Sequence, residues 1–367
     1  MRVLILTNNV LGLFAFRKEL ILKLLSDGNS VSVAGKYCEK TGFFQSHGCK
    51  MIETNIDSKS VNPLKELKLF RKYKLIIKEE NPNIVLTYTV KPNIYGGLIC
   101  KKNKIPCISN VTGLSASIVK GGFFSKLLLF LYKRAIEENK CVFFQNQSNL
   151  DFFKSLNIVN DNSKLLPGSG VNLKEFDFIN YPDDNNKISF LFVGRICKDK
   201  GFDEFAECAR YIISRYDNVT FDAIGEIEDK NLNKLIKQCV NDGVINYYGL
   251  RFDVKSFYGS HHAVVLPSYH EGMSNVLLES LACGRPVIAS DIHGCKETFD
   301  DGISGFSFKA KSTSDLIEKV EKFINLPYSS KVKMGVEGRK KVENEFDREI
   351  VIREYYKEIF RQNLYVL

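Results

Sequence analysis

Two carboxylates stand close together in one stretch of the sequence, AVVLPSYHEGMSNVLLESLACGRPVIAS at residues 263–290. They are Glu271 and Glu279, with seven residues between them. An ionised carboxylate accepts two hydroxyl hydrogen bonds, so a pair that faces one ligand suits a polyol such as a sugar or a ribose. The same spacing also fits a solvated loop acid and an acid on a helix surface. The secondary structure around the two glutamates is therefore needed to choose between these interpretations.

The surrounding pattern predicts a strand, a loop, a helix and a second strand. The apolar run 263–267 is typical of a buried parallel strand, and apolar periodicity predicts a helix from Ser274 to Cys283. Gly284 ends this helix, and a second strand follows at 287–290. Ligands of α/β sheets bind where a strand's carboxyl end meets a helix's amino end, and free backbone N–H groups there favour an anion. We predict that four residues offer such N–H groups: Gly272, Met273, Ser274 and Asn275.

Two cations follow another predicted strand of the same region. Residues 188–195 predict the strand, and the loop 194–201 at its end carries Arg195 and Lys200. Fixed cations and a helix amino end suit a diphosphate, whereas the glutamates suit hydroxyl groups. Together these residue types predict a nucleotide-sugar site; the alternative for the two cations is an ordinary place on the surface.

The chain is long enough for about two domains, since its 367 residues include 44% hydrophobic and 12% aromatic ones. Strand and helix patterns alternate without interruption, which predicts the α/β class, and the tail from residue 300 onward is predicted to be helical. The polar, turn-rich segment 181–186 is the predicted linker. We therefore predict domains at 1–180 and 181–346, with a C-terminal helix at about 347–367 that crosses back to the first domain.

The first domain opens with a predicted strand at 2–7, a helix at 14–25 and a strand at 30–35. This order is typical of a nucleotide-binding half. However, GxGxxG is absent and Gly12 is alone in the first loop, so a dinucleotide is not expected. Two further loops, at 91–97 and 112–114, are predicted at the same sheet edge.

The segments GRICKDKG (194–201) and LPSYHEGMSNVLLESLACGRPVIASDIHGCKE (266–297) resemble the retaining glycosyltransferases of family 4. That family has the GT-B fold, in which two Rossmann-like domains face each other across a cleft, and the alternation of elements extends the resemblance over nearly the whole chain. KPNIYGG (91–97), NVTGLSA (110–116) and LPGSGVNLKEF (166–176) resemble a bacterial subgroup. Its members add a hexose or N-acetylhexosamine to polyprenyl-diphosphate-linked saccharides, and some of them are α-1,3-N-acetylgalactosaminyltransferases.

The resemblance implies a function for each residue of the second domain's site. Arg195 and Lys200 would bind the diphosphate of a UDP-sugar and stabilise the charge that develops on it. Glu279 would hold the ribose hydroxyls and Glu271 those of the donor sugar, with the N–H groups of residues 272–275 beside them. The family needs no catalytic metal and no cofactor, and its transfer proceeds by front-side attack that keeps the α configuration.

The first domain departs from the family pattern in two loops. Many members carry a histidine where this chain has Val111-Thr112-Gly113, and Thr112 is the expected substitute. The first loop lacks the paired glycines that often lie against the donor diphosphate, which leaves Gly12 for that contact. We expect the acceptor to meet Thr112, Gly113 and Arg17; the alternative for Arg17 is a surface arginine.

The formal charge of +9 is unevenly distributed. Residues 1–182 carry 26 Lys and Arg against 14 Asp and Glu, or +12, whereas the remaining residues carry 26 against 29, or −3. A basic first half suits a nucleic acid, a phosphorylated substrate or a membrane surface, and a generally basic surface is the alternative. Because no aromatic-basic module supports nucleic-acid binding, that partner is not expected.

The run 118–134 combines many apolar residues with Lys120, Lys126, Lys133 and Arg134. It is too short and too charged to span a bilayer. Its composition fits an interfacial helix on an anionic leaflet, and the alternative is a buried core helix. Because the half around it is strongly basic, we predict peripheral membrane contact through residues 118–134.

The ten cysteines are scattered without CxxC pairs, which indicates reduced thiols in a cytosolic chain rather than a zinc site. No secretory signal is expected, since the apolar run after Met1-Arg2 is short. The resemblance implies a UDP-sugar-dependent transferase, with α-1,3 GalNAc transfer as the best fit. Its acceptor would be an undecaprenyl-diphosphate-linked saccharide at the cytoplasmic membrane face, for surface-glycan synthesis. The alternative within the fold is a UDP-sugar epimerase, which needs no acceptor.

Overall fold

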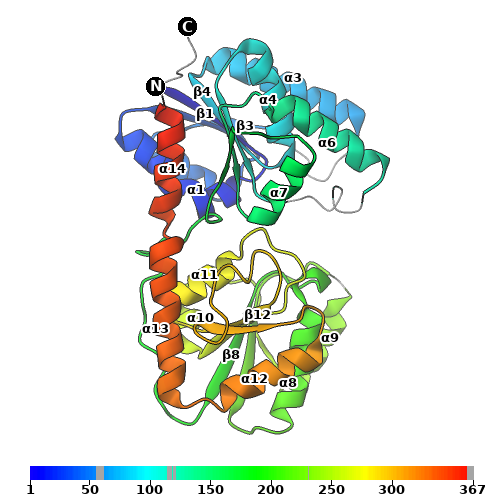
Figure 1. Cartoon of the computed structure of the whole chain (residues 1–367), viewed down its shortest axis with the longest axis vertical. Coiled ribbons are helices and arrows are strands. Elements are labelled where there is room, and N and C mark those ends of the chain that lie inside the picture. The colour runs from blue at the N-terminus through cyan, green and yellow to red at the C-terminus, as the bar shows by residue number, and fades with distance from the viewer. Residues whose placement is uncertain (55–61, 114–117, 119–120, 230, 362–367) are drawn as a thin grey trace. The chain divides into compact units, whose positions relative to one another are not determined.

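The computed structural model describes residues 1–54, 62–113, 118, 121–229 and 231–361. It divides into two compact units, which we name unit 1 (Met1–Ser169 and Ile350–Leu367) and unit 2 (Gly170–Glu349). Each unit is a parallel sheet with helices on both faces, the Rossmann-like arrangement predicted from the alternating pattern (Figure 1). The predicted fold class, α/β with two Rossmann-like domains, is confirmed.

Unit 1 contains a sheet of seven described strands in the order β3-β2-β1-β4-β5-β6-β7, and all neighbours run parallel. Its central strands are continuous apolar runs because helices cover both of their faces. Their carboxyl ends meet at one edge, where ligands of such sheets bind. The strands are β1 (Arg2–Thr7), β2 (Ser30–Gly35), β3 (Lys50–Glu53), β4 (Ile84–Tyr88), β5 (Cys107–Val111), β6 (Cys141–Phe144) and β7 (Ser163–Leu165).

The helices of unit 1 form two layers. Alternation along β1 separates their cores: Val3 and Ile5 face α1 and α14, whereas Leu4 and Leu6 face α3 and α4. Figure 1 shows α3, α4 and α6 on one face of the sheet and α1 with α14 on the other. The helices are α1 (Val10–Ser26), α2 (Thr41–Ser46), α3 (Pro63–Glu80), α4 (Val90–Asn103), α6 (Phe123–Ile136), α7 (Gln147–Ser155) and α14 (Arg348–Phe360).

The last helix, α14, completes the core of unit 1. Tyr355 packs against Phe143 of β6 with ring centroids 4.7 Å apart, and its hydroxyl accepts a hydrogen bond from Asn110 Nδ2 at 2.7 Å. The guanidinium of Arg17 lies over the rings of Tyr88 and Tyr355, 5.6 and 5.5 Å from their centroids. Only 4% of Arg17 is exposed, so this arginine joins α1 to α14 inside the core and is not presented to an acceptor diphosphate.

Unit 2 contains six described strands in the order β10-β9-β8-β11-β12-β13, again all parallel. One core joins the sheet to α8, α9 and α12, and a second joins its other face to α10 and α11. The strands are β8 (Ile188–Val193), β9 (Val219–Ile224), β10 (Asn246–Tyr247), β11 (Ala263–Leu266), β12 (Val287–Ser290) and β13 (Gly305–Phe308). The helices are η1 (Lys198–Lys200, a 3₁₀ turn), α8 (Phe202–Ile213), α9 (Leu232–Asn241), α10 (Val254–Ser260), α11 (Asn275–Ala282), α12 (Thr313–Ile324) and α13 (Tyr328–Glu345).

Two features of the fold differ from the prediction, the boundary between the units and the structure of the tail. Unit 2 begins at Gly170 rather than at residue 181, and Arg285 holds part of the intervening segment by donating to the carbonyls of Ile179 and Asn180 at 2.9 and 2.7 Å. The prediction of a wholly helical tail beyond residue 300 is wrong, because β13 adds a strand beside β12. Four residues that begin with a glycine are too few for the apolar alternation to be recognised.

Candidate active site

Two loops at the carboxyl edge of the unit 2 sheet are bonded to each other. The N–H of Tyr269, which follows β11, donates to the carbonyl of Asp199 at 2.8 Å. Gly201 has φ +68° and lies so close to the Pro267 carbonyl that any Cβ would overlap with it. Glycine is therefore required at this position, and the loop after β8 is fixed beside the loop after β11.

This pairing of loops brings together two residues predicted for catalysis. Lys200 Nζ donates to Glu271 Oε1 at 2.5 Å. The two side chains are only 18% and 13% exposed, so their attraction is screened less than that of a surface ion pair. A cation and a carboxylate at one point can contact a phosphate and a sugar hydroxyl of the same donor.

The loop before α11 offers fewer N–H groups than predicted. The N–H of Ser274 is already donated to the Gly294 carbonyl at 2.7 Å, and Gly272 also has a partner. Ser274 caps α11 through its hydroxyl, which accepts from Leu277 N–H at 3.4 Å. Among the described residues, the N–H groups of Met273 and Asn275 have no hydrogen-bond acceptor. Met273 and Asn275 thus offer unused donors at the start of a helix, a position that favours an anion, whereas the N–H of Ser274 does not contribute.

Gly294 and Glu297, after β12, shape that loop and were not predicted. Glu297 Oε2 accepts from the N–H of Gly294 at 2.6 Å, and the Gly294 carbonyl in turn accepts from Ser274. A Cβ on Gly294 would lie 2.8 Å from the carbonyl oxygens of Glu271 and Gly272. A glycine three residues before a glutamate at a strand end is the signal in the sequence, but only the fold shows what these residues hold.

Glu279 lies on α11, and its carboxyl accepts a hydrogen bond from the Tyr258 hydroxyl at 3.1 Å. Part of the side chain reaches the surface, yet the protein around the carboxyl withholds enough water that burial raises the pKa of Glu279 to about 7. The hydrogen bond from Tyr258 acts in the opposite direction and is the smaller effect. A carboxyl with so little water around it loses little hydration when ligand hydroxyls bind to it.

Arg195 lies at the same sheet edge but pairs with a different carboxylate. Its guanidinium donates to Glu228, in the loop after β9, and the two side chains are 61% and 42% exposed. The N–H of Ile196 donates to the Glu226 carbonyl at 2.8 Å, which fixes the backbones of these two loops. The structure therefore joins Lys200 to Glu271 directly, whereas Arg195 is an exposed cation that pairs with Glu228.

In unit 1, Gly12 is not in a loop. The helix begins at Val10 rather than at residue 14, since the side chain of Asn9 caps it and accepts from the N–H of Gly12 at 2.9 Å. That N–H is therefore not available to a diphosphate, contrary to the expectation for Gly12. Thr112 and Gly113 follow β5 at the carboxyl edge as predicted, with Thr112 exposed, while residues 114–117 of their loop lie outside the described part of the chain.

Thr89, at the end of β4, is a further residue that the sequence did not indicate. Its backbone has φ +74° and ψ 168°, a region that residues with a side chain rarely occupy. Its hydroxyl donates to Asn8 Oδ1 at 2.7 Å, which links the loops after β4 and β1. Strain of this kind is concentrated at functional sites, and Thr89 is placed at the edge where the acceptor is expected.

The run 118–134 forms most of α6, although residues 119–120 lie outside the described part of the chain. Tyr132 and Ala135 are buried, whereas Leu127 and Phe130 are 44% and 58% exposed. One face of this helix is therefore buried in the core, as the alternative interpretation expected, while the other face leaves two apolar side chains exposed; membrane contact through this run stays a prediction. No helix among the described residues combines the length and the apolar character that crossing a membrane requires.

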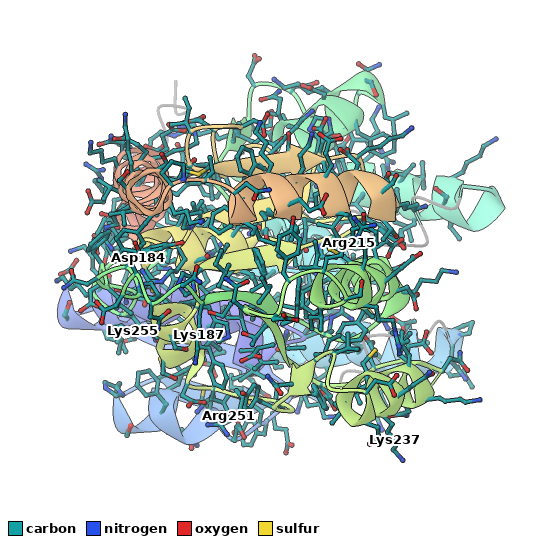
Figure 2. All side chains as sticks on the ribbon, turned by 90° about the horizontal axis from the view of Figure 1, so that it is seen from below. Asp184, Lys187, Arg215, Lys237, Arg251 and Lys255 are labelled. Atoms are coloured by element: carbon teal, nitrogen blue, oxygen red, sulfur yellow. The ribbon has the colours of Figure 1, made fainter. Side chains whose placement is uncertain are left out.

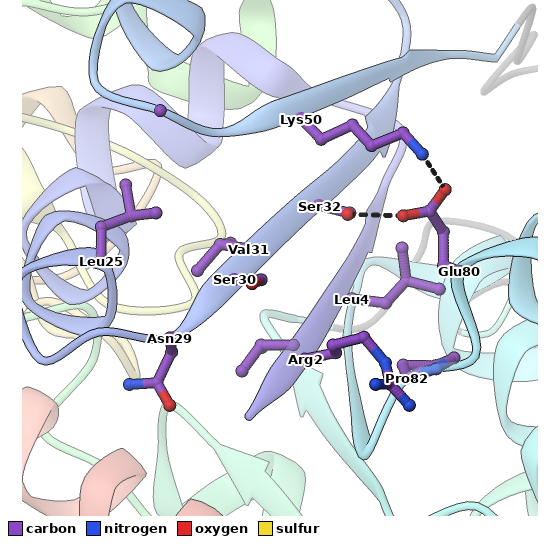
Figure 3. Close-up of a pocket in the computed structure, with 12 residues that line it drawn as sticks. Arg2, Leu4, Leu25, Asn29, Ser30, Val31, Ser32, Lys50, Glu80 and Pro82 are labelled. Carbon is purple, nitrogen blue, oxygen red and sulfur yellow. Dashed lines mark hydrogen bonds and ion pairs between the residues drawn. The ribbon is translucent and has the colours of Figure 1, made fainter.

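A cavity of about 310 Å³ in unit 1 lies at the opposite edge of the sheet, at the amino ends of β1 and β2 (Figure 3). Its carboxylate, Glu80, is held by Lys50 Nζ at 2.6 Å and by the Ser32 hydroxyl at 2.7 Å. Glu80 and Lys50 thus satisfy each other, Arg2 donates to the Asn81 carbonyl at 2.7 Å, and we do not assign the active site to this cavity.

Two family models match the chain: "Glycosyl transferases group 1" over residues 174–341 and "Glycosyl transferase 4-like" over residues 3–146. A capsular polysaccharide biosynthesis glycosyltransferase of Staphylococcus aureus is 30% identical over 308 residues, which cover 79% of each chain. The protein therefore belongs to the class of enzymes that transfer glycosyl groups. More narrowly, the chain belongs to glycosyltransferase family 4, as its motifs indicated.

Other relatives and solved structures agree with this assignment. An N,N'-diacetylbacillosaminyl-diphospho-undecaprenol α-1,3-N-acetylgalactosaminyltransferase of Campylobacter jejuni is 29% identical over 337 residues, 87% of this chain and 88% of the relative. The Anabaena protein HepE, solved with UDP and glucose, has a TM-score of 0.80 at 15% identity, over 99% of this chain and 100% of that one. A glycosyltransferase of Rickettsia africae has a TM-score of 0.81 at 20% identity, over 99% of each chain. The structural likeness shows a shared fold.

Proposed function

We propose that this glycosyltransferase moves a hexose or N-acetylhexosamine, GalNAc in an α-1,3 linkage, from a UDP-sugar to an undecaprenyl-diphosphate-linked saccharide. The proposed use of a UDP-sugar donor rests on one observation, the contact of Lys200 with Glu271 beside the N–H groups of Met273 and Asn275. The proposed undecaprenyl-diphosphate-linked acceptor is supported by the likeness to the Campylobacter enzyme over 87% of the chain. The product would enter surface-glycan assembly.

The donor would replace contacts that the protein makes with itself. A diphosphate that settles at the start of α11 accepts from Met273 and Asn275 and attracts Lys200 away from Glu271. Glu271 is then free to accept from hydroxyls of the donor sugar, and Glu279 accepts from those of the ribose. Arg195 leaves Glu228 and adds a second cation to the diphosphate.

In the transfer, the bond between C1 of the donor sugar and the diphosphate oxygen breaks, while an acceptor hydroxyl bonds to C1 from the same face. The hydroxyl proton passes to the departing diphosphate. Lys200 and Arg195 stabilise the negative charge that grows on this leaving group, which is the largest electrostatic change in the reaction. The proposal involves neither a metal ion nor a cofactor.

The acceptor would bind at the carboxyl edge of unit 1, with Thr112 and Gly113 next to the transferring sugar. Its lipid would remain in the cytoplasmic membrane leaflet, and the exposed side of α6 would contact the bilayer peripherally. That side carries Leu127 and Phe130 between the exposed cations Lys126 and Arg134.

A panel of UDP-sugars assayed with and without an undecaprenyl-diphospho-saccharide tests the proposal. We expect UDP release that requires the acceptor, is greatest with UDP-GalNAc, and gives an α-linked product by NMR. Conversion of the UDP-sugar in the absence of acceptor would contradict transfer and indicate epimerisation. Failure to release UDP from any donor with the acceptor present would contradict the whole proposal.

A further inference from the structure

Tyr269, two residues before Glu271, is bonded through both its backbone and its side chain to the segment that carries Lys200. Its N–H donates to the Asp199 carbonyl at 2.8 Å, and its hydroxyl donates to Glu204 Oε1 at 2.5 Å. Asp199 comes directly before Lys200, and Glu204 lies in the first turn of α8, four residues after the lysine. The tyrosine therefore holds this segment on both sides of Lys200.

The bond between Tyr269 and Glu204 is charge-assisted and largely shielded from water. Burial raises the pKa of the Tyr269 hydroxyl, and the Glu204 carboxylate that accepts its hydrogen bond adds to this effect. The second oxygen of the carboxylate, Glu204 Oε2, is buried and has no hydrogen-bond partner among the described residues. A hydroxyl that donates to such a carboxylate binds it more strongly than it would bind a neutral acceptor.

Lys311, in the loop after β13, adds a third contact to the tyrosine. Its ammonium lies 4.9 Å from the centroid of the Tyr269 ring, as in a cation–π contact. The backbone of Lys311 has φ +64°, a left-handed conformation that residues other than glycine rarely adopt. Close to it, Thr313 Oγ1 donates to Glu207 Oε2 of α8 at 3.0 Å. Strain of this kind persists only where the surrounding structure imposes it.

The contacts of Tyr269 restrict the position of Glu271. Only His270 separates the two residues, so a displaced tyrosine displaces the glutamate as well. Gly294 restricts the same loop from the next strand, since a Cβ on it would lie 2.8 Å from the Glu271 carbonyl oxygen. Strand β11 lies between β8 and β12 in the sheet. The loop is therefore held toward Lys200 on the β8 side and confined on the β12 side.

We propose that Tyr269 is a positioning residue, which holds Glu271 beside Lys200 where the sugar of the donor is expected. It acts through its two bonds to the Lys200 segment and does not itself touch the donor. The inference rests on the proposed function, because it takes Glu271 to be the acceptor of the sugar hydroxyls. UDP has no such sugar, so the binding of UDP should depend much less on Tyr269 than the binding of a UDP-sugar does.

Calorimetric titration of the full chain with UDP and with each UDP-sugar of the panel tests this role without an acceptor. Tyr269→Phe removes the hydroxyl and keeps the ring beside Lys311. Its Kd for the UDP-sugar that binds most tightly should rise about tenfold, while its Kd for UDP stays within about twofold of the parent value. A tyrosine with a merely structural role would change both affinities equally or neither of them.

Variants of Glu204 show whether the hydrogen bond itself is responsible. Glu204→Gln keeps an oxygen that can accept from Tyr269, so its Kd for the UDP-sugar should stay within about threefold of the parent value. Glu204→Leu removes the acceptor and should match Tyr269→Phe. The double variant Tyr269→Phe/Glu204→Leu should bind no more weakly than either single variant, because all three lack the same bond. Additive losses in the double variant overturn the proposal.

The matched control removes a tyrosine hydroxyl at the opposite end of β11. The Tyr181 hydroxyl donates to the carbonyl of His262, the residue before this strand, at 2.9 Å. Lys187, the residue before β8, is labelled in Figure 2 and belongs to the same amino edge of the sheet. Tyr181→Phe should leave both Kd values within about twofold of the parent values, because the site is distant from this bond.

Three results overturn the positioning role: equal rises of both Kd values in Tyr269→Phe, an unchanged Kd for the UDP-sugar, or the same selective loss in Tyr181→Phe. Transfer assays separate this inference from the proposed function. If UDP-sugar binding depends on Tyr269 as expected but the parent chain transfers to no undecaprenyl-diphospho-saccharide, the proposed transfer fails and the positioning role stands. If the parent chain transfers and Tyr269→Phe keeps its kcat/KM and Kd for the donor, the positioning role fails and the proposed function stands.

Discussion

The carboxyl edges of the two sheets are built from different chemistry. In unit 2 the edge is charged: Lys200 meets Glu271, and Arg195 meets Glu228. In unit 1 the edge combines one ion pair, Lys91 with Glu66, with neutral groups such as Asn110, which donates to Tyr355, and Thr89, which donates to Asn8. The first half of the sequence nevertheless carries the net positive charge, +12 over residues 1–182 against −3 over the remainder.

The difference shows that net charge and site charge are separate properties. Many cations of unit 1 are on outer helix surfaces such as that of α3, where they would act on a partner through their summed charge. Lys200 and Arg195 of unit 2 stand next to carboxylates after strand ends, where each would act on individual atoms of a ligand. Donor binding should therefore depend on single charges in unit 2, and acceptor binding on shape and neutral hydrogen bonds in unit 1.

The largest effect is expected from removal of the charge at the unit 2 edge. Lys200→Ala should lower kcat/KM for the UDP-sugar by about 10²–10³-fold, because a cation fixed at a leaving group is lost. Lys198→Ala is the matched control, since Lys198 is exposed in the same short turn. Steady-state kinetics with varied donor measure both variants, and equal losses would mean that the turn rather than the charge matters.

The shape of the same edge can be tested without altering a charge. Gly294→Ala should lower kcat/KM by roughly 10- to 100-fold, since its Cβ would press on the Glu271 and Gly272 carbonyls and displace the donor loop. Gly302→Ala is the control, because Gly302 has a similar φ, +75° against +86°, but open space around it. Both variants should lose about 1 kcal/mol of stability from the strained backbone. A loss of activity in Gly302→Ala would attribute the effect to strain alone.

Glu279 links donor binding to pH. The pKa of its carboxyl, about 7, lies above the ~4.3 of an unfolded chain, so the folded state binds the proton more tightly. The unfolding free energy should therefore fall as pH rises from about 4 to about 7, and Glu279→Gln should remove this slope and stabilise the protein at about pH 8. The same variant should raise the KM for donor by about tenfold through the lost ribose contact.

Urea unfolding at about pH 5 and pH 8, together with donor kinetics, measures both parts of this prediction. Glu318→Gln, an exposed position on α12, is the control and should change neither quantity. A slope that persists in Glu279→Gln would place the titrating group elsewhere.

The smallest effect is expected at the neutral edge of unit 1. Thr89→Gly relieves the strained backbone but loses the hydrogen bond to Asn8 and gains unfolded-state freedom, so stability should change by no more than about 1 kcal/mol. The KM for acceptor should rise a few-fold while the KM for donor stays constant. Lys104→Gly, at the far end of α4 with φ +54°, controls for glycine itself. Equal changes in both KM values would contradict the separation of the two edges.

The residues at the carboxyl edge of unit 2 could be predicted from the sequence, because local patterns show where each strand ends. A strand that ends before Lys200 and another that ends before Glu271 meet at one edge in any parallel sheet. The direct contact of the two side chains was not predictable, because it depends on the bond between Asp199 and Tyr269. In the same way, the N–H of Ser274 donates to the carbonyl of Gly294, a residue in the loop after the neighbouring strand β12.

In unit 1, local rules were insufficient for two of the predicted residues. The capping of α1 by Asn9 could have been predicted, since asparagine is a preferred residue just before the first turn of a helix. The burial of Arg17 was not, because one of its two aromatic partners is Tyr355, near the other end of the chain. Long-range packing of this kind leaves no periodic signal.

The return of α14 to unit 1 has a consequence for the order in which the nascent chain folds. Val351, Ile352, Tyr355 and Ile359 fill the core that β1, β4 and β6 share with α1. These side chains leave the ribosome after unit 2, so the part of the first sheet's face that α14 covers beside α1 stays uncovered while unit 2 is translated. Unit 2, although second in the sequence, should be the first to reach its complete native core, and a ribosome stalled before α14 should hold unit 1 as a target for chaperones.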